Sequence, residues 1–369
     1  MTLRPFVLER YFARHEFSAR WLLSSSECEP WSMSEILAMA DAECRGLWED
    51  LSLRYTESAG HPLLRRAVAD MYDAIRPEQT LIAAPEEGIF LSMHAVLRRG
   101  DHVVCTAPGY QSLHEVARAI GCEVDEWRPV EGESWRFDVN DLDARLRPDT
   151  RLLVVNFPHN PTGALPSDDE FAEVVDRARR RSAYLFSDEM YRGLEHGARV
   201  PLPAACDVYD RAISLSGLSK AYGLPGLRVG WLATRDHEML QRAAELKDYT
   251  TICSGAPSEI LALIALRSSR TILAAQRARV EANLLSIEEF MADHRDRFSW
   301  RRPSAGSVAF PRIHANQGAE AFCEKLVREH GIMLLPSTVF DDRDSHVRFG
   351  YGRRGLCEGL ERLAEVLAG

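Results

Sequence analysis

Three polar residues, Asn160, Asp188 and Lys220, each follow a short apolar segment of the chain. Lysine is rare here, because almost all of the 45 basic residues are arginines, so a lysine in such a position stands out. A lysine amine that is buried near other cations loses its proton readily and becomes a nucleophile. If the three apolar segments are neighbouring parallel strands, the three side chains meet beyond their carboxyl ends, where such sheets bind ligands.

Each of these residues also has a plain structural explanation. Asn160 opens the sequence Asn-Pro-Thr-Gly, which forms turns readily. Asp188 could cap a helix, and Lys220 could lie in a surface loop. One at a time these explanations are favoured. Together the residues are better explained by one cofactor site, because all three fall at the same edge of one predicted sheet.

The elements that would position these residues alternate between apolar β-rich runs and helical patterns. Predicted strands cover residues 81–84, 102–106, 152–157, 183–187, 212–216 and 229–234, and predicted helices between them include 87–99, 111–120 and 168–181. Because the strands are continuous apolar runs, we expect helices on both faces of the sheet. The alternation predicts an α/β fold with a mostly parallel sheet.

The two ends of the chain have a different pattern. Helices are predicted over residues 32–50, 62–75, 271–294, 319–330 and 355–367, and short strands over 332–335 and 346–350. We therefore expect a large α/β domain over residues 51–280 and a smaller α+β domain over 281–369. An N-terminal segment, residues 1–50, is expected to join the small domain.

Composition narrows the function classes. The 369 residues are 46% hydrophobic with a net charge of −10, which is typical of a globular protein and opposes a nucleic-acid or anionic-membrane binder. No apolar run approaches the roughly 18 residues of a membrane span, and the N-terminus lacks a signal-peptide pattern. The eight cysteines have no metal-ligand spacing. They indicate reduced thiols, a cytoplasmic location and no metal site.

Three motifs resemble the class I/II aminotransferases, which are pyridoxal-phosphate (PLP) enzymes of fold type I. The motifs are residues 156–163, 187–191 and 219–230, and the similarity extends from about Arg54 to Arg348. The resemblance implies a large domain with a seven-stranded, mostly parallel sheet, a smaller α+β domain, PLP as cofactor and an amino acid as substrate. It also implies a homodimer with shared active sites.

The resemblance assigns roles to the residues at the strand ends. Lys220 would form a Schiff base with the cofactor aldehyde and then move the substrate α-proton as general base and acid. Asp188 would keep the pyridine nitrogen protonated. Asn160 and Tyr191 would hydrogen-bond the phenolic oxygen of the ring, and Tyr110 would stack on it.

The cofactor phosphate would be held by Arg228, by Ser219 and by the N-terminus of the helix that starts near Pro85. Here the sequence departs from the family, because the phosphate loop is Ala-Pro-Glu-Glu-Gly. Pro85 has no N–H, and Glu86 and Glu87 bring two carboxylates close to a dianion. The plain explanation is that the glutamates complement the helix dipole.

The resemblance places further residues around the substrate. Arg348 would clamp the α-carboxylate with two parallel hydrogen bonds. Tyr55 would reach into the partner's site and help to hold the cofactor phosphate there. Substrate specificity would come from the loop 23–31, which contains Ser26, and from residues 247–251 of the partner. If that loop faces the pocket, the charge of its glutamates, Glu27 and Glu29, favours a substrate with a cationic side chain. The alternative is that both are ordinary surface glutamates.

Transamination is the reaction expected first. The alternative is elimination and cyclisation of a hydroxylated, arginine-like amino acid, because residues 155–161, 218–231, 247–250 and 306–312 resemble enzymes of the capreomycidine synthase type. A third hypothesis is a PLP-binding regulator. It is disfavoured, because such a regulator needs a DNA-binding domain and the N-terminal segment lacks a basic helix pair.

Overall fold

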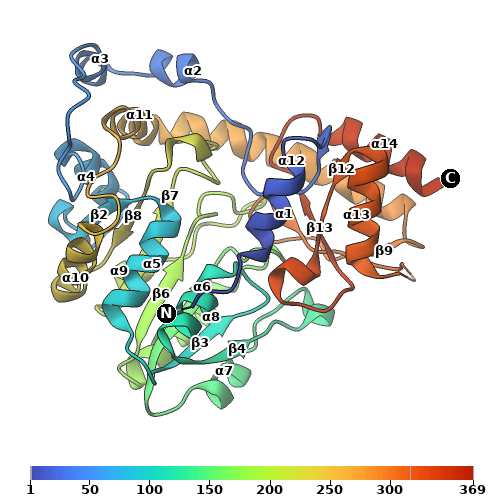
Figure 1. Cartoon of the computed structure of the whole chain (residues 1–369), viewed down its shortest axis with the longest axis horizontal. Helices are drawn as coiled ribbons and strands as arrows, with labels where there is room; N and C mark the ends of the chain where they lie inside the picture. Colours follow the sequence, from blue (N-terminus) through green and yellow to red (C-terminus); the bar gives the residue numbers. More distant parts are fainter. Residues whose placement is uncertain (1, 316, 369) are drawn as a thin grey trace.

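A seven-stranded sheet forms the centre of the molecule in a computed structural model that describes residues 2–315 and 317–368 (Figure 1). Its strand order is β2-β8-β7-β6-β5-β3-β4. The strands are β2 (Thr80–Ala83), β3 (His102–Thr106), β4 (Glu123–Trp127), β5 (Thr150–Asn156), β6 (Tyr184–Asp188), β7 (Ala212–Gly217) and β8 (Gly230–Ala233). All neighbours pair in parallel except β8, which is antiparallel to both β2 and β7. The expected mostly parallel α/β sheet is confirmed.

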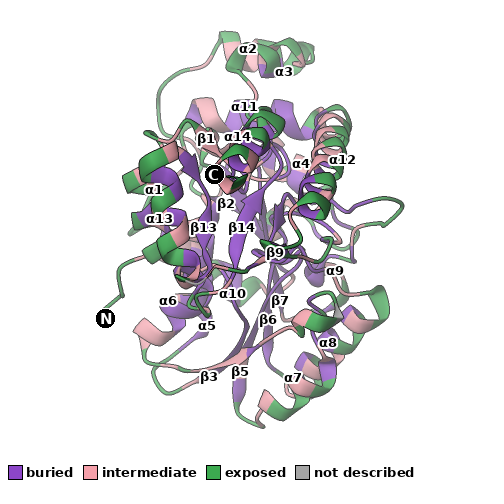
Figure 2. Ribbon diagram, turned by 90° about the vertical axis from the view of Figure 1, so that its right-hand side faces the viewer, coloured by how far each residue is buried: buried purple, intermediate pink, exposed green. Residues whose placement is uncertain are grey.

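Helices cover both faces of this sheet. One face carries α5 (Pro85–Val96), α6 (Ser112–Ile120) and α10 (His237–Lys247), and the other carries α7 (Val139–Arg145), α8 (Asp168–Arg180) and α9 (Ala205–Val208). The strands between them, apart from the edge strand β4, are almost wholly buried, while the outer faces of the helices are exposed (Figure 2). The capping box of α8, in which Ser167 and Glu170 bond each other's backbone, fixes where that helix starts.

The register of the central strands sets up the site. Asn156 at the end of β5 lies opposite Asp188 at the end of β6, and Asp188 lies opposite Leu215 in β7. The polar residues after these strands therefore emerge side by side. The apolar strands hold this edge in place, because their burial leaves no freedom to slip by one residue.

The C-terminal part of the chain packs with the N-terminal segment. Its strands are β9 (Phe298–Ser299), β10 (Val308–Ala309), β11 (Arg312–Ile313), β12 (Ile332–Met333), β13 (Leu335–Pro336) and β14 (Val347–Gly350), with helices α13 (Gly318–His330) and α14 (Leu356–Ala368). Strand β1 (Trp21–Leu22) pairs with β12. Helix α1 (Val7–His15) packs on the short 3-10 turn Ser337–Phe340. The 25-residue α12 (Ser269–Asp293) precedes this part of the chain.

Several element bounds differ from the prediction. Strand β4 was not predicted, because it is a half-exposed edge strand with three acidic residues among its five. The helix expected over 32–50 is two helices, α2 (Met33–Ala38) and α3 (Ala42–Glu49), because Asp41 caps the second one by accepting a hydrogen bond from the Cys44 amide at 2.8 Å. Helix α4 (Pro62–Ala69) ends before residue 75, and α11 (Ala256–Arg267) leads into α12.

Within the described residues, no helix is long and apolar enough to cross a membrane. The eight cysteines are all free thiols, five of them buried. No group of three or more histidine, cysteine, aspartate or glutamate side chains in residues 2–315 and 317–368 is arranged to hold a metal ion.

Candidate active site

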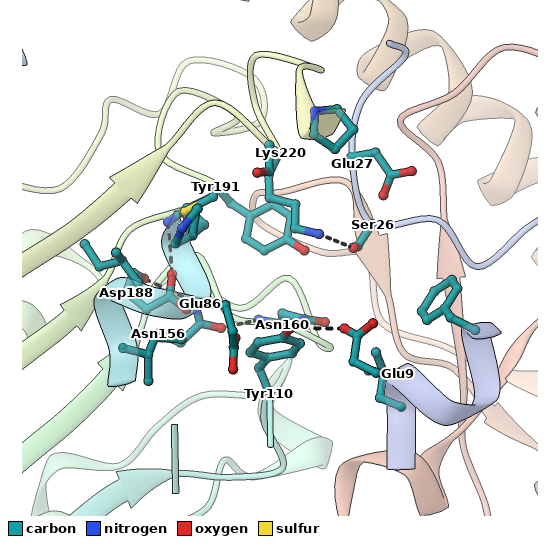
Figure 3. A pocket seen from close by; sticks show the side chains of 18 of the residues that line it. Glu9, Ser26, Glu27, Glu86, Tyr110, Asn156, Asn160, Asp188, Tyr191 and Lys220 are labelled. Atoms are coloured by element: carbon teal, nitrogen blue, oxygen red, sulfur yellow. Dashed lines mark hydrogen bonds between the residues drawn. The ribbon is translucent and has the colours of Figure 1, made fainter. Parts of the chain in front are cut away.

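A cavity of about 360 Å³ lies beyond the carboxyl ends of β5, β6 and β7 (Figure 3). The sheet and the start of α5 form one side of it, and α1 and the loop that contains Ser26 form the other. Most of the predicted site residues line this cavity: Ser26, Glu86, Tyr110, Asn160, Asp188, Tyr191, Ser219, Lys220, Arg228 and Arg348. Segments that are far apart in the sequence thus meet at the edge where parallel sheets bind ligands.

Lys220 projects into the cavity from the segment that follows β7. Its Nζ donates a hydrogen bond to the Oγ of Ser26 at 2.8 Å. Burial lowers the pKa of Lys220, and the nearby carboxylate of Glu27 opposes part of that shift. The amine is therefore easier to deprotonate than an exposed lysine, which suits a nucleophile and a proton carrier.

Asp188 ends β6 on the wall opposite Ser26 (Figure 3). Its Oδ1 accepts a hydrogen bond from the Met190 amide at 3.1 Å. Burial raises the pKa of Asp188 to about 7, and the positive charge of Lys220 offsets only part of this effect. No described side chain forms an ion pair with this carboxylate, so it is ready for a cationic ring nitrogen.

Asn160 and Arg348 are joined at the floor of the site. The Asn160 amide N–H donates to Asn156 Oδ1 at 2.8 Å, and Asn160 Oδ1 accepts from Arg348 Nη1 at 3.1 Å. Arg348 Nη2 donates to the Ser24 carbonyl at 2.7 Å. The Nε of the same guanidinium is buried and has no hydrogen-bond partner. The guanidinium is thus fixed in place with a donor to spare for a carboxylate.

Two buried hydroxyl groups in the cavity have no hydrogen-bond partner, those of Tyr191 and Ser219. Leaving a buried polar group unpaired costs about 1–3 kcal/mol. Burial also raises the pKa of Tyr191, so the phenol stays protonated and can donate. Such orphaned groups next to Lys220 and Asp188 fit a polar ligand that carries a phosphate and a phenolic oxygen.

Carboxylates that the sequence prediction missed face the same cavity. Glu9 on α1 accepts a hydrogen bond from the Tyr110 hydroxyl at 3.1 Å, and Glu16 lines the cavity just beyond that helix. Residues seven apart project from the same side of a helix. The spacing of Glu9 and Glu16 therefore indicated that both carboxylates face the same way. Nothing in the sequence indicated that α1 lies over the strand ends.

Other predicted residues lie outside the cavity lining. Glu87 turns away and accepts hydrogen bonds from Thr250 and, at 2.8 Å, Thr251. Tyr55 lies with an exposed side chain in a separate groove formed with α3 and α11. Glu29 accepts from the Arg354 amide at 2.7 Å and does not face the cavity.

The family model for aminotransferase class I and II matches residues 36–367, which is most of the chain. The chain belongs to the class I and II aminotransferase family. The resemblance carried by the three motifs is confirmed, and so is the fold type.

Individual relatives include both aminotransferases and ring-forming enzymes. The capreomycidine synthase of Streptomyces vinaceus is 32% identical, over 98% of this chain and 93% of that protein. A PLP-dependent aminotransferase from Streptococcus suis superposes with a TM-score of 0.93 at 31% identity, covering 100% of this chain and 98% of the other. The PLP-dependent cyclase OrfR gives 0.91 at 31% identity, with the same coverage.

This aminotransferase-family enzyme uses pyridoxal 5'-phosphate, as its relatives do. The residues present fit the cofactor, because the site offers a desolvated amine, an unpaired carboxylate and two orphaned hydroxyls. When bound, PLP supplies an electron sink for a negative charge at the substrate α-carbon. Lys220, Asp188, Asn160, Tyr191 and Ser219 line the cavity and are the side chains that would hold it.

Proposed function

We propose that the protein transfers the amino group of an amino acid with a cationic side chain to a 2-oxo acid. Family membership supports the transfer reaction. The observation that carries the substrate class is the set of carboxylates Glu9, Glu16 and Glu27, which line the cavity on the side of α1 and the N-terminal loop.

The buried cations Arg348 and Lys220 would act on the α-carboxylate and the α-proton, which all amino-acid substrates share. Arg348 is held by Asn160 and Ser24 and keeps Nε free to donate to the substrate α-carboxylate. Lys220 would then carry the α-proton between the α-carbon and the cofactor. The hydrogen bond from Lys220 Nζ to Ser26 Oγ holds the amine toward the N-terminal loop, where we expect the substrate to bind.

The carboxylates would select the side chain. Glu27 pairs with Arg353, and the positive charges of Lys220 and Arg353 lower its pKa despite burial. The Glu16 side chain forms no hydrogen bond or ion pair with another described residue, and burial raises its pKa, with the charge of Glu27 adding to that shift. A guanidinium or ammonium group next to Glu16 would relieve that repulsion.

A second candidate function is elimination and cyclisation of a hydroxylated, arginine-like amino acid. The match to capreomycidine synthase covers 98% of this chain, including the N-terminal residues that precede the aminotransferase family match. In such a reaction the substrate loses one water and a nitrogen of its own side chain closes the ring.

We also propose a cytoplasmic homodimer in which Tyr55 reaches the partner's cofactor phosphate. Support comes from large apolar side chains that the single chain leaves in solvent: Leu53 is 85% exposed, Tyr55 83% and Tyr249 92%. Burying such groups is favourable, and contiguous exposed apolar side chains mark interaction surfaces.

The division into domains at residues 50 and 280 is also a proposal, and α12 spans the second boundary.

Product analysis distinguishes the two reactions. The PLP-loaded enzyme is incubated with arginine or a hydroxylated arginine, with and without 2-oxoglutarate. The masses of the products are then determined by mass spectrometry. Transamination gives a 2-oxo acid and glutamate and needs the acceptor. Cyclisation gives a product lighter by one water and needs no acceptor.

The substrate class has its own test. Glu16→Gln should lower kcat/KM for arginine about 5- to 30-fold, the effect of losing 1–2 kcal/mol of partly screened charge attraction. It should leave kcat/KM for a neutral amino acid nearly unchanged. Equal rates of the wild-type enzyme on acidic, aromatic and basic amino acids would refute the cationic substrate.

A further inference from the structure

The start of α5 brings a carboxyl group to the place where the cofactor phosphate is expected. Pro85 and Glu86 form its first turn, and both line the cavity. Ala84 provides no side-chain cap, so the first amides of the helix have no such partner. The buried, unpartnered Oγ of Ser219 and the guanidinium of Arg228 line the same cavity. A phosphate held by these donors would share the cavity with Glu86.

The two glutamates of this turn behave differently. Glu87 faces out of the cavity and is bound by Thr250 and Thr251. Glu86 points into the cavity beside the Tyr110 ring (Figure 3). The conflict between carboxylates and a phosphate dianion is therefore confined to Glu86.

No described cation is bonded to Glu86. The Ser112 hydroxyl donates a hydrogen bond to its Oε2 at 3.1 Å. The cations Lys220 and Arg228 line the same cavity without bonding to Glu86. The titratable neighbours that affect Glu86 most are Glu9 from α1, Asp188 from β6 and the phenol of Tyr110. Each of these is acidic, and an ionised Glu86 would add a further negative charge to the group.

The neighbouring arginine does not relieve this crowding. Arg4 reaches the adjacent groove but is bound there by Glu115 at 2.8 Å and by Asp341 at 2.7 Å. Burial, with smaller effects from its neighbours, raises the pKa of Glu86 to about 7. A neutral carboxylic acid has an O–H to donate, whereas a carboxylate can only accept.

We propose that Glu86 stays protonated when PLP binds and donates its O–H to a phosphate oxygen, which makes cofactor retention dependent on pH. This inference rests on PLP as the cofactor and not on the proposed substrate or reaction. In the neutral form Glu86 adds a hydrogen bond, and once ionised it repels the dianion. Affinity for PLP then falls as pH rises above the pKa that Glu86 has in the free protein, by up to about tenfold per pH unit.

The test is equilibrium dialysis of the full-length holoenzyme between pH 6 and 8.5, with released PLP measured by absorbance. Glu86→Gln keeps the side-chain shape and an N–H donor but cannot ionise. The ratio of the wild-type Kd to the Glu86→Gln Kd should be flat below pH 7. Above pH 7 it should rise by up to about tenfold per unit. Other titrating groups are common to both proteins, so they cancel in this ratio.

Two matched controls localise the effect. Pyridoxal, which lacks the phosphate, should give a ratio that does not change with pH. Glu87→Gln should keep the wild-type pH dependence, because that carboxylate is turned to Thr250 and Thr251. A ratio for PLP that is flat across the whole range would overturn the proposal, and so would equal pH dependence for pyridoxal.

A measurement on the wild-type holoenzyme does not depend on how the variant folds. The infrared C=O band of a neutral carboxylic acid should be present near pH 7 with PLP bound and absent in Glu86→Gln. If the band is missing in the wild type, Glu86 is ionised beside the cofactor and the inference is wrong. Failure of the amino-group transfer assay alone leaves both of these readouts intact.

Discussion

Replacing Asp188 by asparagine should improve the stability of the cofactor-free protein relative to wild type as pH rises from 5 to 7, while it destroys activity. The carboxyl group is buried at the end of β6, and burial raises its pKa from 3.8 to about 7. In the unfolded chain it ionises near its ordinary value. The native state therefore keeps a proton that the unfolded state loses, and the wild-type free energy of unfolding falls as pH rises from about 4 to about 7.

The size of this effect follows from the shift. One pH unit of differential titration corresponds to about 1.4 kcal/mol, so two units between pH 5 and pH 7 give about 2.7 kcal/mol. The asparagine in the Asp188→Asn variant does not titrate, so the variant does not lose this part of the free energy of unfolding between pH 5 and pH 7. Its stability relative to wild type should therefore improve by about 2–3 kcal/mol over that interval. For a chain of this length the change amounts to about 3 °C in Tm.

The assay is thermal or urea unfolding of both cofactor-free proteins at several pH values from 5 to 7. The amide carries N–H groups that need partners, which adds a penalty of about 1–3 kcal/mol at every pH. The prediction accordingly concerns the slope of the stability difference against pH and not its value at one pH. A difference that stays constant, or that shrinks as pH rises, would refute the reasoning.

The same variant should bind PLP more weakly and lose at least about a hundredfold in kcat, because an amide cannot keep the ring nitrogen protonated. Lys220→Ala should abolish the cofactor absorbance that borohydride fixes to the protein; retention of that fixed absorbance would disprove the role of Lys220. The protein should sediment as a dimer, and Tyr55→Phe should raise the Kd for PLP several-fold. Mixing Lys220→Ala subunits with Tyr55→Phe subunits should give, in each heterodimer, one site that has both native side chains and therefore wild-type affinity for PLP. A monomer in the ultracentrifuge would remove the basis for that expectation.

Local patterns were enough to predict the sheet edge that carries the chemistry. Residues 152–157, 183–187 and 212–216 are continuous apolar runs, and each is a buried central strand. Because parallel neighbours end at the same edge, the position of Asn160, Asp188 and Lys220 in the sequence already placed them together. The edge strand β4 gave no such signal, since a strand with solvent on one side does not need an apolar run.

Contacts between distant segments could not be predicted in the same way. Glu9 meets Tyr110 across 101 residues of sequence, and Ser26 meets Lys220 across 194. These contacts depend on how α1 and the N-terminal loop dock over the strand ends. Pairing of β1 with β12 and the 2.7 Å hydrogen bond from the Gly350 amide to the Leu23 carbonyl fix that docking. Neither interaction leaves a motif in the sequence.

The residues expected to bind the cofactor and those proposed to select the substrate lie in different parts of the chain. The family match begins at residue 36 and contains Lys220 and Asp188, the groups that we expect to serve PLP chemistry in general. The cavity-lining carboxylates that we propose to select the substrate, among them Glu9 and Glu16, come before it. Relatives that match this chain almost from end to end include a capreomycidine synthase and a cyclase as well as an aminotransferase. Since the strand-end groups can support either reaction, the choice of substrate and of reaction should respond to substitutions in the first 35 residues more than to changes elsewhere in the cavity wall.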